Sequence, residues 1–149
     1  MINGKSLTEL NLGILGGGQL GKMLCQAASN WDLNTTVLDP SADCPSTNFC
    51  TNFIKGNFRE YVDVIKLLGD VDLATIEIEH VNVNGLKYLE DKGVEVRPSP
   101  NIIEIIKDKG KQKTFYEEKN LPTSDFIICS DKDEVLKKFN EGVIKIPFV

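Results

Sequence analysis

The sequence predicts an α/β fold, in which an open parallel sheet carries helices on both faces. Short apolar runs alternate along residues 1–100 with segments whose apolar residues recur at helical spacing. The first run, residues 12–15, ends in glycines and is followed by a helical segment and a β-branched run at 35–38, which is the order of a β-α-β unit. A chain of 149 residues with 41% hydrophobic content can form one compact domain and part of a second.

The first strand, the first helix and the second strand are each marked by their side chains. Residues 12–15 are apolar without interruption, as expected of a parallel strand buried on both faces. Residues 19–30 predict a helix because apolar side chains recur at helical spacing, namely Leu20, Met23, Leu24 and Ala27. Residues 35–38 are β-branched or apolar, and Asp39-Pro40 ends this strand.

The alternation continues to residue 100 and then changes in character. The further elements predicted up to that point are an edge strand at 53–54, a helix at 60–68, a strand at 73–78, a helix at 83–91 and a strand at 94–96. Beyond it we predict helices at 102–106, 108–119 and 131–139 and strands at 126–129 and 143–149. Roughly 40 residues cannot enclose a core alone. We therefore predict one domain at 1–100 and, at 101–149, only the beginning of another.

The composition argues against several classes of function. A net charge of −5 and a pI near 4.9 do not favour a general affinity for nucleic acid. No apolar run approaches the roughly 20 residues that cross a membrane, and no leader-like segment begins the chain, so we expect a cytoplasmic protein. Four cysteines and one histidine form no metal-ligand pattern, so no metal site is predicted in this chain. Cys44 and Cys50 are near enough in sequence to pair, but disulfides are unusual inside cells.

A glycine-rich turn is the first candidate for ligand binding. Residues 16–21 (GGGQLG) match G-x-G-x-x-G between a predicted strand and a predicted helix. Such glycines let backbone N–H groups approach a ligand, and the helix start adds unpaired N–H groups that suit phosphate. Alternatively, the glycines only let strand and helix pack closely. Asp39 would bind ribose hydroxyls in a dinucleotide enzyme, or would merely begin a turn at Pro40, so a dehydrogenase and other Rossmann-like modules are both open.

Acidic residues at the end of the strand predicted at 73–78 are the second candidate. The carboxyl ends of parallel strands face the ligand, and Glu77 and Glu79 share one side if the strand continues through them. Their carboxylates would suit an amine, a ribose or a magnesium ion, or one would act as a general base. A solvated loop is the alternative. His80 has no partner ligands and is expected to be structural or exposed to solvent.

Four segments together resemble one family. Residues 12–24 (LGILGGGQLGKML) are similar to the opening of 5-(carboxyamino)imidazole ribonucleotide synthases of the ATP-grasp superfamily. Residues 75–81 (TIEIEHV) resemble the family's Thr-Tyr-Glu-Phe-Glu-Asn-Val, with Ile, Ile and His at the differing positions. Residues 96–100 (VRPSP) are similar to its Pro-Ser-Pro segment, and residues 108–115 resemble the start of its ATP-grasp domain. Together, the four segments indicate this family more specifically than any one of them does.

The resemblance implies a ligase of de novo purine biosynthesis that carboxylates 5-aminoimidazole ribonucleotide to 5-(carboxyamino)imidazole ribonucleotide. ATP would phosphorylate bicarbonate, and the carboxyphosphate would deliver carbon dioxide to the substrate's amine. Magnesium would offset the charge of the transferred phosphoryl group. The implied partners are therefore small molecules, namely the ribonucleotide, bicarbonate and ATP, and the full-length enzyme is expected to be a homodimer.

The resemblance also assigns residues to the site. The substrate-binding residues that it implies are Gly16, Gly17, Gly18, Gln19, Leu20, Glu77 and Glu79. It implies two ATP-binding residues, Lys109 and Lys113, although Lys109 replaces an Arg and would lose a bidentate grip on phosphate. Residues 147–149 (PFV) match the beginning of a family strand. The catalytic residues, the phosphate loop and the magnesium ligands are expected beyond Val149, so we expect the 149-residue chain alone to be inactive.

Three alternatives stand beside this prediction. One is another ATP-grasp ligase, such as a formate-dependent glycinamide ribonucleotide transformylase, against which residues 77–81 argue. The second is a Rossmann NAD-dependent dehydrogenase with Asp39 on the ribose. The third is a non-catalytic nucleotide-binding module.

Overall fold

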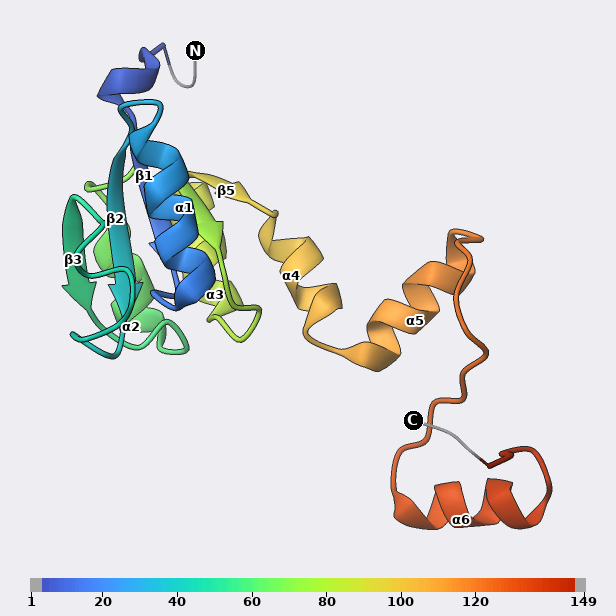
Figure 1. Ribbon diagram of the computed structural model, residues 1–149. Coiled ribbons are helices and arrows are strands. Elements are labelled where there is room, and N and C mark those ends of the chain that lie inside the picture. Colours follow the sequence, from blue (N-terminus) through green and yellow to red (C-terminus); the bar gives the residue numbers. More distant parts are fainter. Residues whose placement is uncertain (1–3, 147–149) are drawn as a thin grey trace. The chain divides into compact units, whose positions relative to one another are not determined.

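The computed structural model describes residues 4–146, which form two compact units (Figure 1). Unit 1 ends at Lys107 and unit 2 begins at Asp108. The strands are β1 (Asn11–Leu15), β2 (Asn34–Asp39), β3 (Asn52–Lys55), β4 (Leu73–Ile76) and β5 (Glu95–Arg97). The α-helices are α1 (Gln19–Ser29), α2 (Tyr61–Val64), α3 (Val83–Asp91), α4 (Pro100–Ile106), α5 (Lys109–Glu118) and α6 (Lys132–Asn140), and the 3-10 helices are η1 (Leu7–Glu9) and η2 (Ile65–Leu67).

The five strands of unit 1 form one parallel sheet in the order β3-β2-β1-β4-β5. Leu15 of the central strand β1 lies opposite Leu38 of β2 and Ile76 of β4. Successive strands are added on one side of β1 and then on the other, so the strand order reverses between β1 and β4. Open sheets of this kind bind ligands outside the carboxyl ends of the strands at the point of reversal. The predicted open parallel α/β sheet is confirmed.

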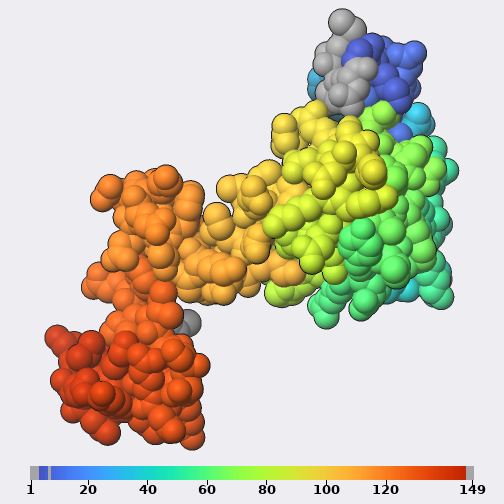
Figure 2. Space-filling model, turned by 180° about the vertical axis from the view of Figure 1, so that it is seen from behind, coloured from blue at the N-terminus to red at the C-terminus, as the bar shows by residue number. Residues whose placement is uncertain are grey.

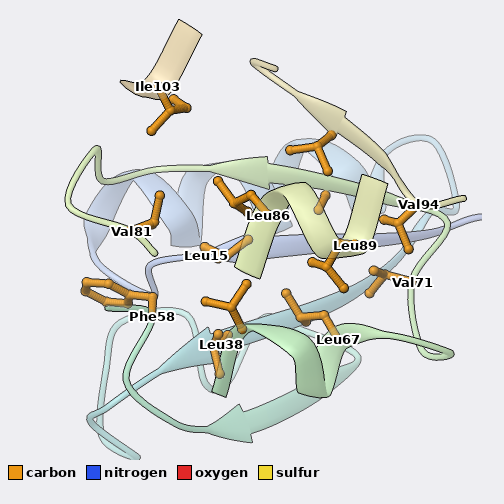
Figure 3. Packing of buried hydrophobic residues seen from close by; sticks show 13 residues of the cluster. Leu15, Leu38, Phe58, Leu67, Val71, Val81, Leu86, Leu89, Val94 and Ile103 are labelled. Atoms are coloured by element: carbon orange, nitrogen blue, oxygen red, sulfur yellow. The ribbon is translucent and has the colours of Figure 1, made fainter. Parts of the chain in front are cut away.

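The larger hydrophobic cluster lies on the face of the sheet that α2, η2 and α3 cover (Figure 3). Leu15 and Leu38 from the sheet and Leu86 and Leu89 from α3 are inaccessible to solvent. Burial of a leucine side chain stabilises the fold by roughly 1.5–3 kcal/mol relative to an exposed one. Figure 2 shows the molecule from behind, and α3, in yellow-green, lies at the surface of unit 1 in this view.

The opposite face of the sheet is covered by α1 through small residues. A second cluster joins Ile14 and Val37 of the sheet to Cys25 of α1. The other residues that α1 buries are Gly21 and Ala28, whereas Leu20 and Met23 are 58% and 60% exposed. The predicted helix is confirmed, but the apolar residues that predicted it are not those that face the sheet. Small residues face it because they let the helix lie close to the strands.

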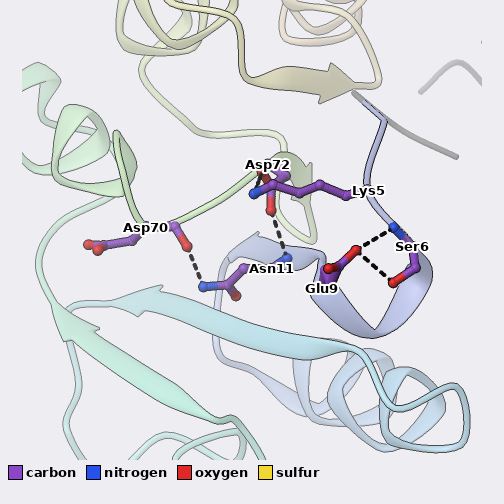
Figure 4. Close-up of polar contacts among 6 residues, drawn as sticks. All are labelled: Lys5, Ser6, Glu9, Asn11, Asp70 and Asp72. Atoms are coloured by element: carbon purple, nitrogen blue, oxygen red, sulfur yellow. Dashed lines mark hydrogen bonds and ion pairs between the residues drawn. The ribbon is translucent and has the colours of Figure 1, made fainter.

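Polar contacts close the amino end of the sheet, opposite the carboxyl ends of the strands (Figure 4). Lys5 Nζ lies 2.5 Å from Asp72 Oδ1, and Asp72 Oδ2 accepts a hydrogen bond from the N–H of Asn11 at 3.1 Å. The side chain of Asn11 also donates to the carbonyl of Asp70. The pKa of Asp72 is lowered, first by the hydrogen bond from Lys5. These contacts tie the turn before β4 to the start of β1.

Two elements of unit 1 differ from the prediction. The helix predicted at 60–68 is divided into α2 and the 3-10 helix η2. The strand predicted at 73–78 ends at Ile76, so Glu77 and Glu79 do not project from a continuing strand. The reason lies in the neighbouring strand. The pairing of β1 with β4 ends where Leu15 lies opposite Ile76, and the N–H of Glu77 makes the last hydrogen bond to β1, so the residues after Glu77 have no partner in that strand.

Unit 2 contains helices but no strand among its described residues. Asp108 and Asp131 cap α5 and α6, because their side chains accept N–H groups of the first helical turn. The strand predicted at 126–129 is wrong, since no described segment pairs with it. The strand predicted at 143–149 is not formed over its first four residues, and residues 147–149 lie outside the described range. No described residue of this unit is buried, so these residues hold no core of their own.

Candidate functional site

Three neighbouring strands bring the candidate residues to one edge of the sheet. β1 is followed by the glycine turn (residues 16–18), β2 ends at Asp39, and β4 is followed directly by Glu77. The N–H of Glu77 donates to the carbonyl of Leu15 at 2.9 Å, which holds Glu77 beside the end of β1. The structure therefore brings together two segments that are far apart in sequence, and it does so at the point where the strand order reverses.

Close contacts account for the glycines. Gly16 has φ +107°, and a Cβ there would lie 2.6 Å from Oε2 of Glu77. A Cβ on Gly17 would overlap Sγ of Cys44, and one on Gly21 would overlap the carbonyl oxygen of Gly16. Any side chain in the turn would push away either the acid after β4 or the helix that follows. Close packing of strand, helix and Glu77 is thus one reason for the motif.

Asp39 uses both carboxylate oxygens within the protein. Oδ2 accepts the N–H of Gly17 at 2.7 Å, and Oδ1 accepts the N–H of Ser41 at 2.8 Å. The residue is 9% exposed. Hydrogen bonds from backbone N–H groups to a carboxylate are short and strong. Burial and these two contacts direct the carboxylate into the protein, whereas an acid that binds ribose must present an oxygen to the ligand, so the arrangement does not favour the dehydrogenase alternative.

Ser46 holds the other side of the same glycine. Its backbone N–H and its Oγ both donate to the carbonyl oxygen of Gly17, at 3.0 and 2.9 Å, and the residue is fully buried. Sequence reasoning missed Ser46, because it lies in a turn-rich stretch without a motif. The contact joins residues 29 positions apart, and only the fold of the loop after β2 creates it. Asp39 was noticed in the sequence as the acid at the end of a predicted strand, but the role considered for it was binding of ribose, not a contact with Gly17.

The start of α1 offers backbone donors beside an acid. The helix has no side-chain cap, and no described residue accepts the N–H of Gly18 or of Gln19. The first N–H groups of a helix have no partner within it and carry partial positive charge. A Cβ on Gly18 would lie 3.6 Å from Oε1 of Glu77. The side chains of Gln19 and Leu20 are exposed. This combination suits a ligand that presents acceptors to the N–H groups and hydroxyl or amine donors to the carboxylate.

Glu79 lies apart from the glycine turn in its described contacts. Its carboxylate is 3.7 Å from Nε2 of His80, and these side chains are 50% and 55% exposed. Its carbonyl accepts the N–H of Val81 at 2.8 Å. Of the two predicted acids, Glu77 is the one that contacts the turn.

The two predicted ATP-binding lysines lie on α5 in unit 2. Lys109 is exposed, and its Nζ donates to Oε1 of Gln112 at 3.2 Å. Lys113 Nζ donates to Oγ1 of Thr123 at 2.6 Å and to Oγ of Ser124 at 2.8 Å. Lys113 thus connects α5 to the segment that follows it, whereas the described hydrogen bond of the Lys109 side chain stays within α5.

The described residues contain no group of three or more His, Cys, Asp or Glu side chains arranged to hold a metal ion. None of their helices is long and apolar enough to cross a membrane. All four cysteines are free, so Cys44 and Cys50 do not form a disulfide.

Comparison with known proteins relates the whole of this edge to one family. Residues 10–107 match the model of the ribonucleotide synthetase pre-ATP-grasp domain. The chain is 38% identical over 125 residues to the chloroplastic phosphoribosylaminoimidazole carboxylase of Vigna aconitifolia, covering 84% of this chain and 22% of that protein. It is 35% identical over 140 residues to the N5-carboxyaminoimidazole ribonucleotide synthase of Saccharolobus solfataricus, covering 90% of this chain and 36% of that protein.

A solved structure with ligands is also similar. It is the crystal structure of N5-carboxyaminoimidazole synthase from Aspergillus clavatus in complex with ADP and 5-aminoimidazole ribonucleotide, with a TM-score of 0.81 and 28% identity. The match covers 91% of this chain and 37% of that chain. This chain therefore spans between 22% and 37% of the length of these three relatives.

Proposed function

This chain belongs to the family of ribonucleotide synthetase pre-ATP-grasp domains, and from that premise we propose that it is the amino-terminal part of a 5-(carboxyamino)imidazole ribonucleotide synthase. The reaction proposed for the longer protein is the ATP- and bicarbonate-dependent carboxylation of 5-aminoimidazole ribonucleotide in de novo purine biosynthesis. A relative with this name and a related synthase solved with ADP and the ribonucleotide support the proposal.

The observation that carries the proposal is the position of Glu77 across from the glycine turn, where the strand order reverses. The N–H groups of Gly18 and Gln19 have no described acceptor, so they can donate to oxygens of the ribonucleotide. The carboxylate of Glu77 would accept from the ligand's hydroxyl or amine groups. Asp39, whose carboxylate a nicotinamide enzyme would turn to the ribose, is buried and accepts the backbone N–H groups of Gly17 and Ser41 instead.

The residues of this chain would bind and orient the ribonucleotide. A substrate amine held by Glu77 in a fixed direction meets its carbon source with less loss of entropy at the moment of reaction. Enclosure of that amine would also keep water from the reactive carboxyphosphate. ATP, with magnesium, would supply the phosphoryl transfer and would be bound mainly by residues outside this chain.

We also propose a domain division and a role for two lysines. Residues 1–100 would be the pre-ATP-grasp domain, and residues 101–149 would begin the ATP-grasp domain. The division into compact units after Lys107 supports a boundary in this region, although Ile103 of α4 packs with the core of unit 1. Lys109 and Lys113, on the first helix after that division, are proposed as ATP contacts of the longer enzyme.

Calorimetric titration of the 149-residue chain with three ligands tests the proposal. We expect binding of 5-aminoimidazole ribonucleotide and no binding of NAD or glycinamide ribonucleotide. Glu77→Gln should weaken the binding that is observed. Binding of NAD without a response to 5-aminoimidazole ribonucleotide would support the dehydrogenase instead, and preference for glycinamide ribonucleotide would support the transformylase. We expect no ATP- and bicarbonate-dependent turnover by this chain alone.

Cell compartment and assembly are part of the proposal. A cytoplasmic location is supported by four free cysteines, since reducing compartments keep thiols unpaired. Microscopy of the tagged protein would test it, and signal confined to an organelle would contradict it. A homodimer of the longer enzyme is expected from the family resemblance, and light scattering after size-exclusion chromatography measures it directly.

A further inference from the structure

The peptide groups on both sides of Gly17 are held by buried side chains. The N–H of Gly17 donates to Asp39, and its carbonyl accepts two hydrogen bonds from Ser46. Asp39 is 9% exposed and Ser46 is inaccessible to solvent. Gly17 therefore has no backbone group left for a ligand, although it lies in the middle of the turn.

The same contacts determine where the next donor points. A trans peptide is planar, so its C=O and its N–H point in opposite directions. The carbonyl of Gly17 and the N–H of Gly18 belong to one peptide. When Ser46 holds that carbonyl, the N–H of Gly18 is directed away from the buried loop. No described residue accepts that N–H.

We infer that Ser46 and Asp39 are positioning residues of the ribonucleotide site, which act by directing the N–H of Gly18 toward the ligand. The inference rests on the proposed function, because it takes the start of α1 as the binding edge. Asp39 orients the peptide before Gly17, and Ser46 orients the peptide after it. A glycine has wide conformational freedom, so without these contacts the turn would lose much of the order that binding requires.

The chain provides a matched control for each residue. Thr47, next to Ser46, also donates its hydroxyl to a backbone carbonyl, that of Ala42 at 2.8 Å, and the described hydrogen bonds of this hydroxyl go to Ala42 and to Sγ of Cys44, not to the glycine turn. Asp72 accepts a backbone N–H as Asp39 does, but at the opposite end of the sheet. If a variant bound the ribonucleotide more weakly only because it was less stable, the control variants would also bind more weakly. If the cause is lost positioning of the Gly18 N–H, only the variants of Ser46 and Asp39 would bind more weakly.

The test is titration of the 149-residue chain with 5-aminoimidazole ribonucleotide, followed by calorimetry and by ¹H–¹⁵N spectra. Ser46→Ala should weaken binding about three- to tenfold, since it removes one of the two hydrogen bonds to the carbonyl of Gly17. Asp39→Asn should weaken binding roughly tenfold or more, because an amide has one acceptor oxygen for two N–H donors. Thr47→Ala and Asp72→Asn should bind as the unmodified chain does.

The spectra supply a readout that stability does not move. In the unmodified chain the ligand should shift the amide resonance of Gly18, and in Ser46→Ala this shift should shrink. Equal affinity and an equal Gly18 shift in Ser46→Ala and Asp39→Asn would overturn the inference while leaving the proposed function intact. Failure of the unmodified chain to bind the ribonucleotide would overturn both. Equal weakening in Thr47→Ala would assign the effect to the loop as a whole and would also overturn the inference.

Discussion

Replacement of Gly21 by alanine would disturb the junction between the glycine turn and α1. Inside an ordinary helix this change stabilises by about 1 kcal/mol. Here the new methyl group would overlap the carbonyl oxygen of Gly16 and lie 3.0 Å from Oγ of Ser46. The turn cannot yield freely, because the N–H of Gly17 is held by Asp39 at 2.7 Å. Overpacking typically costs about 1–3 kcal/mol, and a disrupted hydrogen bond costs about 1 kcal/mol more.

We therefore expect Gly21→Ala to lower the free energy of unfolding by about 1–3 kcal/mol. Urea unfolding followed by far-ultraviolet circular dichroism measures it. Gln26→Ala is the control, because Gln26 is exposed on the same helix and its replacement should change stability by no more than about 0.5 kcal/mol. A Gly21→Ala chain as stable as the unmodified one would refute the reasoning, since the turn would then be free to move aside.

Three further predictions address the salt contact, the core and the acid. The hydrogen bond from Lys5 lowers the pKa of Asp72 in the folded state. The ionised Asp72 therefore stabilises the fold above about pH 4, and this contribution is lost as the pH falls through the folded-state pKa. Asp72→Asn should flatten the acid side of the stability profile, and an unchanged profile would contradict this. Leu86→Ala, at a fully buried site, should cost about 2–5 kcal/mol, whereas Leu20→Ala should change stability by less than about 0.5 kcal/mol; similar losses would place Leu20 in the core. In the longer enzyme, Glu77→Gln should raise the KM for the ribonucleotide about tenfold and that for ATP less than about twofold. Equal losses would indicate a folding role.

Periodicity predicted the elements of unit 1 well, because it depends only on residues that are close together in the sequence. The apolar run at 12–15 and the β-branched run at 35–38 lie within β1 and β2, and the helix predicted at 83–91 has the bounds of α3. These patterns depend on neighbours two to four positions away, which the sequence displays directly. The strand predicted at 126–129 had a similar pattern but no described partner, and a strand needs one.

The face of α1 shows a second limit of local patterns. Leu20 and Met23 have the spacing of a buried stripe, yet they are largely exposed, and Gly21 and Cys25 face the sheet instead. Spacing indicates that a helix has an apolar side. How closely that helix approaches the strands depends on the turn before it, and this decides which side chains have room.

By itself, the sequence determined that strands and helices alternate, that glycines follow the first strand, and that acids lie near the end of the fourth. Each of these depends on side chains close together along the chain. Only the tertiary structure decided that Glu77 lies against Gly16, that Asp39 accepts the N–H of Gly17, and that Ser46 holds the carbonyl of the same glycine. Those contacts join residues 22 to 61 positions apart, and they arise because parallel strands bring their carboxyl ends to one edge whatever the length of the chain between them.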